Sequence, residues 1–192
     1  MTAVLEIRPY DPDWPRQFEA ERQRIAAALG ALALRIDHNG STAVPGLAAK
    51  PVIDIQISVG SLHPLAAYAA RLAGIGYRHV PHADDAFCPF FHRPRDWPHT
   101  HHVHVVQAGG DEERRSLAFR DYLREHAEAV REYERLKRRL ATQYSAAQPS
   151  EREAYAQAKG SFIEAVIAQA LALGYPRELE RAATQRPGGQ RP

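Results

Sequence analysis

The chain has 192 residues, of which 44% are hydrophobic and 25% are charged, and its formal net charge is only +2. This balance is typical of one folded domain in water, and it gives no reason to expect bulk binding to nucleic acid or to an anionic membrane. A single cysteine excludes an internal disulfide and fits a reducing cytoplasm, which is the expected location. The sequence predicts neither a signal peptide nor a membrane span of ~18 apolar residues.

The first half of the chain predicts strands and helices in mixed order. Alternating or continuous apolar residues predict strands, and apolar residues at helical spacing predict helices. Between the second and third strands, residues 38–50 form a loop rich in small side chains. In chain order the expected elements are a strand at 4–8, a helix at 16–29, strands at 32–36 and 51–59, a helix at 62–73, and strands at 77–80, 87–93 and 102–107.

The second half of the chain predicts helices. Residues 111–143 and 150–173 are dominated by helix-forming side chains and are interrupted near Gln148 and Pro149. The expected fold is therefore α/β of the α+β type, with a mixed sheet, flanking helices and a helical C-terminal half. We expect one domain over residues 1–175 and a disordered tail over 176–192.

A glycine-serine pair followed by an aspartate on a strand indicates a phosphate and cation site. A loop of small residues brings backbone N–H groups and the hydroxyls of Ser41 and Thr42 close to a phosphate. Asp54 and Gln56 share one face of the next strand, because residues two apart point the same way. We expect Asp54 to be catalytic and to hold a divalent cation. We expect Gly40, Ser41, Thr42 and Gln56 to contact the phosphate.

Two histidines alternate with valines on a later strand. His102 and His104 share a face, and Val103 and Val105 take the other, buried face. If this strand lies beside that of Asp54, the three polar side chains form a set typical of Zn²⁺, Mn²⁺ or Fe²⁺ sites. Alternatively, one histidine acts as a general base or binds phosphate as a cation, or both are polar residues on a solvated face.

Three basic side chains are candidates for holding an anion. Lys50, at the end of the small-residue loop, and Arg120 and Lys159, on expected helices, supply positive charge for a phosphate if they face the same pocket. The alternative is that they are ordinary solvated side chains. The charge run REYERLKRR at 131–139 predicts a solvated helix face with ion pairs four residues apart.

Several longer strings resemble one family of proteins. Gly40-Ser41 followed by Asp54-Ile55-Gln56 is similar to the nucleotidyltransferase pattern of a Gly-Ser pair before an Asp-x-Asp or Asp-x-Glu strand. The strings that closely resemble the GrpB family, whose fold is nucleotidyltransferase-like, are RPYDPDWPRQFEAERQRI at 8–25, HNGSTAVPGLAAKPVIDI at 38–55, HHVHVV at 101–106 and FRDYLREH at 119–126.

The resemblance implies a function, but the sequence departs from the nucleotidyltransferase pattern at one position. It implies transfer of a nucleotidyl or phosphoryl group, or binding of a phosphorylated small molecule or nucleotide, with Mg²⁺ or Mn²⁺ favoured over Zn²⁺. Active nucleotidyltransferases carry a carboxylate where this chain has Gln56, which weighs against a site for two magnesium ions. The alternatives are a catalytically inactive relative that binds a ligand or partner, and a histidine-based metal hydrolase.

Overall fold

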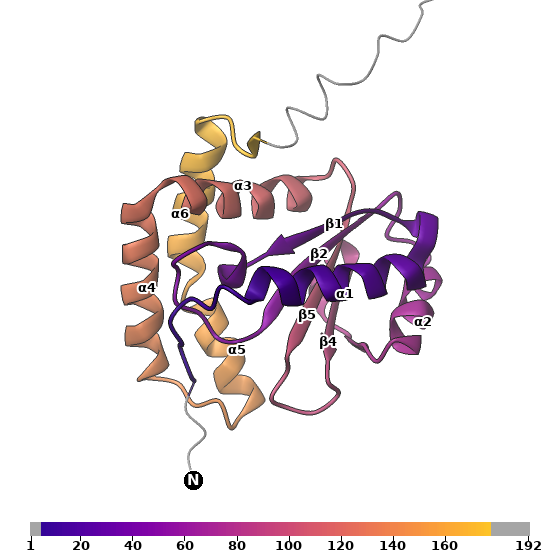
Figure 1. The fold of residues 1–192 in the computed structure, drawn as a ribbon, viewed down its shortest axis with the longest axis horizontal. Coiled ribbons are helices and arrows are strands. Elements are labelled where there is room, and N and C mark those ends of the chain that lie inside the picture. The colour runs from indigo at the N-terminus through magenta and orange to yellow at the C-terminus, as the bar shows by residue number, and fades with distance from the viewer. Residues whose placement is uncertain (1–4, 178–192) are drawn as a thin grey trace, which may run out of the picture.

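A computed structural model describes residues 5–177 (Figure 1). Its helices are α1 (Trp14–Leu29), α2 (Ala66–Gly74), α3 (Asp111–Glu125), α4 (Ala127–Ala141), α5 (Pro149–Gln157) and α6 (Gly160–Ala172). Its strands are β1 (Ala33–Asn39), β2 (Ile53–Val59), β3 (Arg78–Val80), β4 (Phe90–Arg93) and β5 (His101–Gln107). The predicted mixed α/β fold with a helical C-terminal half is confirmed. Apart from its first two residues, the predicted tail lies outside the described residues.

The five strands form one mixed sheet in the order β1-β2-β5-β4-β3. β2 runs parallel to β5 and antiparallel to β1, and β4 runs antiparallel to both β5 and β3. The register places Asp54 directly beside His102 on the neighbouring strand. β2 and β5 are therefore neighbours, and the side chains of Asp54 and His102 lie side by side on the same face of the sheet.

Helices cover both faces of the sheet (Figure 1). α1 and α2 pack on one face, and the shared core contains the alternating apolar residues of the central strands, Ile53, Ile55, Ile57, Val103 and Val105. α3 lies on the opposite face, with α4 and α6 packed against it. The polar residues of β2 and β5 therefore face the C-terminal helices. Over residues 5–177, none of the helices has the length and hydrophobicity required to cross a bilayer.

One local expectation differs from the structure, and one helical segment is divided in two. Within residues 5–8, only Arg8 pairs with another segment, through an isolated bridge to Ala49, so the predicted first strand is wrong. The helix-forming segment 111–143 contains two helices, separated at His126 by a non-helical backbone (φ −123°, ψ 87°). The His126 ring stacks on Tyr122, and its Nδ1 lies 2.8 Å from the Tyr122 carbonyl oxygen. These contacts hold the chain at the corner.

Candidate functional site

A cavity of about 680 Å³ opens between the polar face of the sheet and the C-terminal helices. Its volume lies within the usual range for small-molecule sites, roughly 300–1,000 Å³. The cavity brings together eight of the residues that the sequence singles out: Gly40, Ser41, Thr42, Lys50, Asp54, His102, His104 and Lys159. The short 3₁₀ turn at Ser41–Ala43 therefore opens into the same space as the middle of β2.

Gly40 allows the turn to pass directly over Asp54. The backbone of Gly40 has φ 64° and ψ −167°, a conformation that is essentially restricted to glycine. A Cβ atom at this position would lie 2.3 Å from Asp54 Oδ2 and 2.8 Å from Asp54 Cγ. The Thr42 side chain is buried beneath the turn, where its Oγ1 lies 2.9 Å from His38 Nε2. Thr42 therefore supports the turn more directly than it serves a ligand.

Asp54 is half-buried and is held by a histidine. His102 Nδ1 lies 3.2 Å from Asp54 Oδ1, and His102 Nε2 lies 3.2 Å from Nδ1 of His99. Burial acts to raise the pKa of Asp54, but the hydrogen bond from His102 and the charges of His102, His104 and Lys50 outweigh it, so the pKa is lowered. Asp54 is therefore a carboxylate at neutral pH.

All the lysines of the chain line this one cavity. Of the 25 lysine and arginine residues, only three are lysines, and they are Lys50, Lys137 and Lys159. Lys50 Nζ and Lys159 Nζ lie 5.1 and 4.5 Å from the centre of the Tyr155 ring. The whole lysine content of a chain that otherwise uses arginine is thus concentrated beside Asp54.

The three ammonium groups are unusually easy to deprotonate. Burial lowers the pKa of Lys137 to about 7, and the charge of Lys159 adds to the effect. Burial, followed by the charge of Lys50, lowers the pKa of Lys159 to about 8. Burial also lowers the pKa of Lys50, while the charge of Asp54 opposes the change in all three lysines. Loss of solvation and mutual repulsion thus disfavour three charged amines in one cavity. The negative charge of a bound anion would offset both effects.

Lys137 is the site residue that the sequence analysis missed. It belongs to the charge run at 131–139, which was expected to be a solvated helix face. The ion pair between Glu134 and Arg138 in that run is present at 2.8 Å, but the Lys137 side chain is only 2% exposed. Its Nζ donates hydrogen bonds to Ser41 Oγ, at 3.1 Å, and to the Ala48 carbonyl oxygen.

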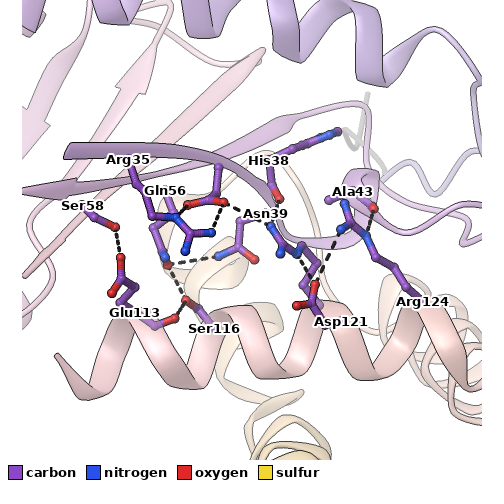
Figure 2. Close-up of polar contacts among 12 residues, drawn as sticks. Arg35, His38, Asn39, Ala43, Gln56, Ser58, Glu113, Ser116, Asp121 and Arg124 are labelled. Atoms are coloured by element: carbon purple, nitrogen blue, oxygen red, sulfur yellow. Dashed lines mark hydrogen bonds and ion pairs between the residues drawn. The ribbon is translucent and has the colours of Figure 1, made fainter. Parts of the chain in front are cut away.

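Two of the predicted phosphate-binding residues do not line the cavity, and this corrects the prediction. Gln56 is fully buried beneath α3, where its Oε1 accepts hydrogen bonds from Ser116 and Asn39 (Figure 2). The expected shared face is present, but α3 covers Gln56 and leaves Asp54 open to the cavity.

Arg120 instead supports the turn that carries Ser41. It is 3% exposed, lies 2.7 Å from Asp121 and 3.5 Å from Asp37, and donates a hydrogen bond to the His38 carbonyl oxygen. One helical turn later, Arg124 donates to the Ala43 carbonyl oxygen at 2.9 Å (Figure 2). The two arginines thus connect α3 to both ends of the turn.

The side chains present do not fit a cluster of metal ions. Within residues 5–177, there is no group of three or more His, Cys, Asp or Glu side chains placed to hold a metal ion. His104 Nδ1 lies 3.9 Å from the thiol of Cys88, whose pKa burial raises to about 12. Asp54 is the single carboxylate on its strand, and a pair of dications needs several.

The fold and the site define a mixed α/β protein in which a lysine-lined cavity opens beside a glycine-serine turn. The chain belongs to the GrpB family, because the family described as "GrpB protein" matches residues 4–169. The chain is 40% identical to a UPF0157 protein of Pseudomonas aeruginosa over 88% of its length and 68% of that relative. It is 38% identical to a UPF0157 protein of Halalkalibacterium halodurans, over 88% of this chain and 83% of the relative.

The solved structure of GrpB from Enterococcus faecalis shares the fold. It aligns with a TM-score of 0.75 and 33% identity over 87% of this chain and 98% of that chain. The Cid1 poly(U) polymerase structure is only distantly similar, with a TM-score of 0.43 and 11% identity over 65% of this chain and 39% of that chain. A protein named dephospho-CoA kinase, from Mycolicibacterium paratuberculosis, is 45% identical over 83 residues, which are 42% of this chain and 20% of that protein.

Proposed function

We propose that this protein binds a phosphorylated small molecule or nucleotide in the lysine-lined cavity. The observation that carries the proposal is the convergence of Lys50, Lys137 and Lys159, the Ser41 turn and Asp54 on one cavity. Compact ammonium groups and the hydroxyl and backbone N–H groups of a glycine-serine turn are suitable donors for phosphate oxygens. The partial match to a dephospho-CoA kinase, a protein named for a phosphorylated small molecule, agrees with this class of ligand.

The other charged side chains of the cavity leave the lysines available for an anion. Glu112 and Glu164, 39% and 61% exposed, are both paired with Arg115, at 3.7 and 2.7 Å. The third glutamate of the lining, Glu153, accepts a hydrogen bond from Gln157 at 3.2 Å. Asp54 alone opposes the lysines with a carboxylate placed close enough to affect the pKa of all three. The lysines therefore have capacity for a further anion.

Lys159→Met is expected to weaken the binding of inorganic phosphate about 10- to 100-fold, because one charge-assisted hydrogen bond to an anion contributes roughly 1.5–3 kcal/mol. Titration calorimetry at pH 6.5 measures the dissociation constant. The control is Arg131→Met, which removes a positive charge from a side chain that is 62% exposed and should leave the constant within about twofold. Equal affinity in the wild type and Lys159→Met, or no binding by the wild type at millimolar phosphate, would contradict the proposal.

The affinity for sulfate is expected to fall about 10- to 100-fold between pH 6 and pH 9. The pKa values of about 7 for Lys137 and about 8 for Lys159 mean that both amines are charged at pH 6 and lose their protons as the pH rises. Sulfate remains a dianion throughout this range, so the change reports the protein. Calorimetric titrations at four pH values measure it, and an affinity independent of pH would show that these amines do not contact the anion.

A second candidate function is nucleotidyl or phosphoryl transfer with one Mg²⁺ or Mn²⁺ ion. It is favoured by the ionised Asp54 carboxylate, which the Gly40 turn covers and His102 orients. One carboxylate with neighbouring hydroxyl groups offers oxygen ligands for a single divalent cation that also binds phosphate. The alternative, a ligand-binding relative without turnover, uses the same cavity without the cation.

The variant Asp54→Asn distinguishes group transfer with a divalent cation from ligand binding without a cation. We expect ATP with Mg²⁺ to stabilise the wild type by about 2–3 kcal/mol at a hundredfold excess over the dissociation constant, and more than ATP with EDTA does. In the variant the Mg²⁺-dependent increment should disappear, while metal-free ATP binds at least as well because a carboxylate that repels phosphate is gone. Thermal unfolding measures both increments. Equal Mg²⁺ increments in the two proteins would contradict the role of Asp54, and nucleotide turnover abolished by Asp54→Asn would exclude the version without turnover.

A further inference from the structure

Ser41 and Lys137 form a hydroxyl–amine pair in the wall of the cavity. Ser41 is half-buried and lines the cavity, whereas Lys137 is only 2% exposed. Lys137 Nζ lies 3.1 Å from Ser41 Oγ, within the distance at which a base takes a proton from a hydroxyl group. An accessible hydroxyl beside a buried amine is the arrangement of a nucleophile with its base, and serine–lysine pairs serve in this way on unrelated folds.

The pair is held in place from two sides. Lys137 also donates to the carbonyl oxygen of Ala48, which fixes its amine at the end of the small-residue loop. Tyr133 lies one helical turn before Lys137 on α4; its ring centre is 4.8 Å from Lys137 Nζ, and its hydroxyl is hydrogen-bonded to Ser41. Ala48 therefore orients the amine and Tyr133 orients the hydroxyl, as a nucleophile and its base require.

We propose that Ser41 accepts a phosphoryl group from the bound ligand, with the amine of Lys137 as the base that takes the serine proton. This inference rests on the proposed function, because it needs a phosphate held in the cavity. Lys50 and Lys159 line the same space and hold the non-reacting phosphate oxygens. The pKa of Lys159, about 8, lies above that of Lys137, about 7, so Lys159 keeps its proton to a higher pH than the base does. Ser41 is then a covalent acceptor as well as a contact for the bound phosphate.

The amine can be neutral at working pH. Burial lowers the pKa of Lys137 to about 7, so a substantial fraction is uncharged just above neutrality. The other charges that act on it are Lys159 and Arg138, which lower the pKa, and Glu134 and Asp54, which raise it. Arginine cannot serve in this role, because a guanidinium group keeps its proton at any pH that a folded protein survives.

The transfer balances without a further reactant. The Ser41 proton passes to the neutral Lys137 amine, which becomes an ammonium ion, while Ser41 Oγ forms a bond to phosphorus. The bond from phosphorus to the leaving oxygen breaks, and that oxygen leaves with the electron pair. Water then attacks the phosphoserine and releases inorganic phosphate. Ser41 Oγ regains a proton, and Lys137 returns to the amine form by releasing its proton to solvent.

The test uses p-nitrophenyl phosphate as the phosphoryl donor and the full chain as the acceptor. At pH 8, with acid quenching during the first turnover, we expect a mass gain of one phosphoryl group on Ser41, matched by release of p-nitrophenolate. Ser41→Ala should lose both signals. Ser161→Ala, which removes an exposed hydroxyl from α6, should keep them. The rate of Ser41 labelling in the wild type should rise as the pH passes through about 7, the pKa of Lys137. This measurement does not depend on whether a variant folds.

Lys137→Arg distinguishes a base from a structural residue. At pH 6, where Lys137 is also charged, the variant keeps the positive charge, so inorganic phosphate should bind within about threefold of the wild type. Labelling at pH 8 should fall about 100-fold or more, since a general base contributes roughly 10²–10⁴. The matched control is Arg138→Lys, next in the chain and exposed. Equal labelling of Lys137→Arg and the wild type would remove Lys137 as the base.

The outcomes separate this inference from the function on which it rests. Phosphate binding by the wild type without phosphorylation of Ser41 would overturn the inference and leave the proposed function intact. Labelling of Ser41 by p-nitrophenyl acetate but not by the phosphate ester would assign acyl chemistry instead and overturn it as well. No binding of inorganic phosphate at all would overturn both.

Discussion

Gly40→Ala is expected to lower the free energy of unfolding by about 2–6 kcal/mol. Two costs combine: roughly 1–3 kcal/mol for a side chain in a glycine-only backbone conformation and roughly 1–3 kcal/mol for an added methyl group without space. The added Cβ would meet three atoms of Asp54 within 2.8 Å, so either the turn or the carboxylate must move. At about 2–4 °C per kcal/mol for a chain of this size, the unfolding temperature should fall by about 4–24 °C.

Gly46→Ala is the matched control for this change. Gly46 lies in the same loop and also has a positive φ, 81°, but a Cβ at this position would have no atom within 4 Å. It should therefore cost only the backbone strain, about 1–2 kcal/mol. Urea unfolding of the two variants measures the difference. Equal losses would show that the close approach of the turn to Asp54 is not maintained in solution.

The parts of the fold that follow from local pattern were predictable. The alternation in β5 and the apolar run around Asp54 in β2 indicated the strands, and the same period of two put Asp54 and His102 on polar faces. The parallel pairing of these strands was not encoded locally, since a register depends on the whole sheet. The corner at His126 was missed because no glycine or proline marks it, and the contacts with Tyr122 that hold it are tertiary.

The candidate site was predictable where a short motif marks it and missed where only packing does. Ser41 and Asp54 stand out in the sequence by their glycine neighbour and their apolar surroundings. Lys137 is surrounded by charged residues, and which of them points inward depends on how α4 packs. One signal was available: in a chain whose positive charges are nearly all arginines, each of the three lysines is exceptional.

Arg120 and Gln56 show why a polar residue near a motif need not touch the ligand. Both belong to a buried polar layer between the sheet and α3, which also contains a hydrogen bond between Ser58 and Glu113 (Figure 2). This layer fixes the distance from α3 to β2, and therefore the position of the turn above Asp54. Sequence pattern cannot distinguish such a supporting layer from the cavity, because both need polar side chains at the same spacing.

Arg120→Met is expected to cost about 3 kcal/mol of stability, or about 6–12 °C in the unfolding temperature. The substitution leaves Asp121, 8% exposed, and Asp37, 11% exposed, without their shared cation. Removing one partner of a buried ion pair costs roughly 3–5 kcal/mol. The lower end applies because Arg35 still pairs with Asp37 at 2.7 Å and Arg124 with Asp121 at 3.6 Å.

The control and the ligand together decide what Arg120 does. Arg16→Met removes an arginine that is 82% exposed and paired with Asp13, and it should change stability by less than about 1 kcal/mol. If Arg120 supports the turn, the variant should lose stability with and without phosphate, and saturating phosphate should add nearly the same increment as in the wild type. Unchanged stability combined with a phosphate affinity more than tenfold weaker would instead make Arg120 a ligand-binding residue. Such a result would mean that α3 moves away from the sheet when the anion binds, since a side chain only 3% exposed reaches the cavity only by leaving both aspartates.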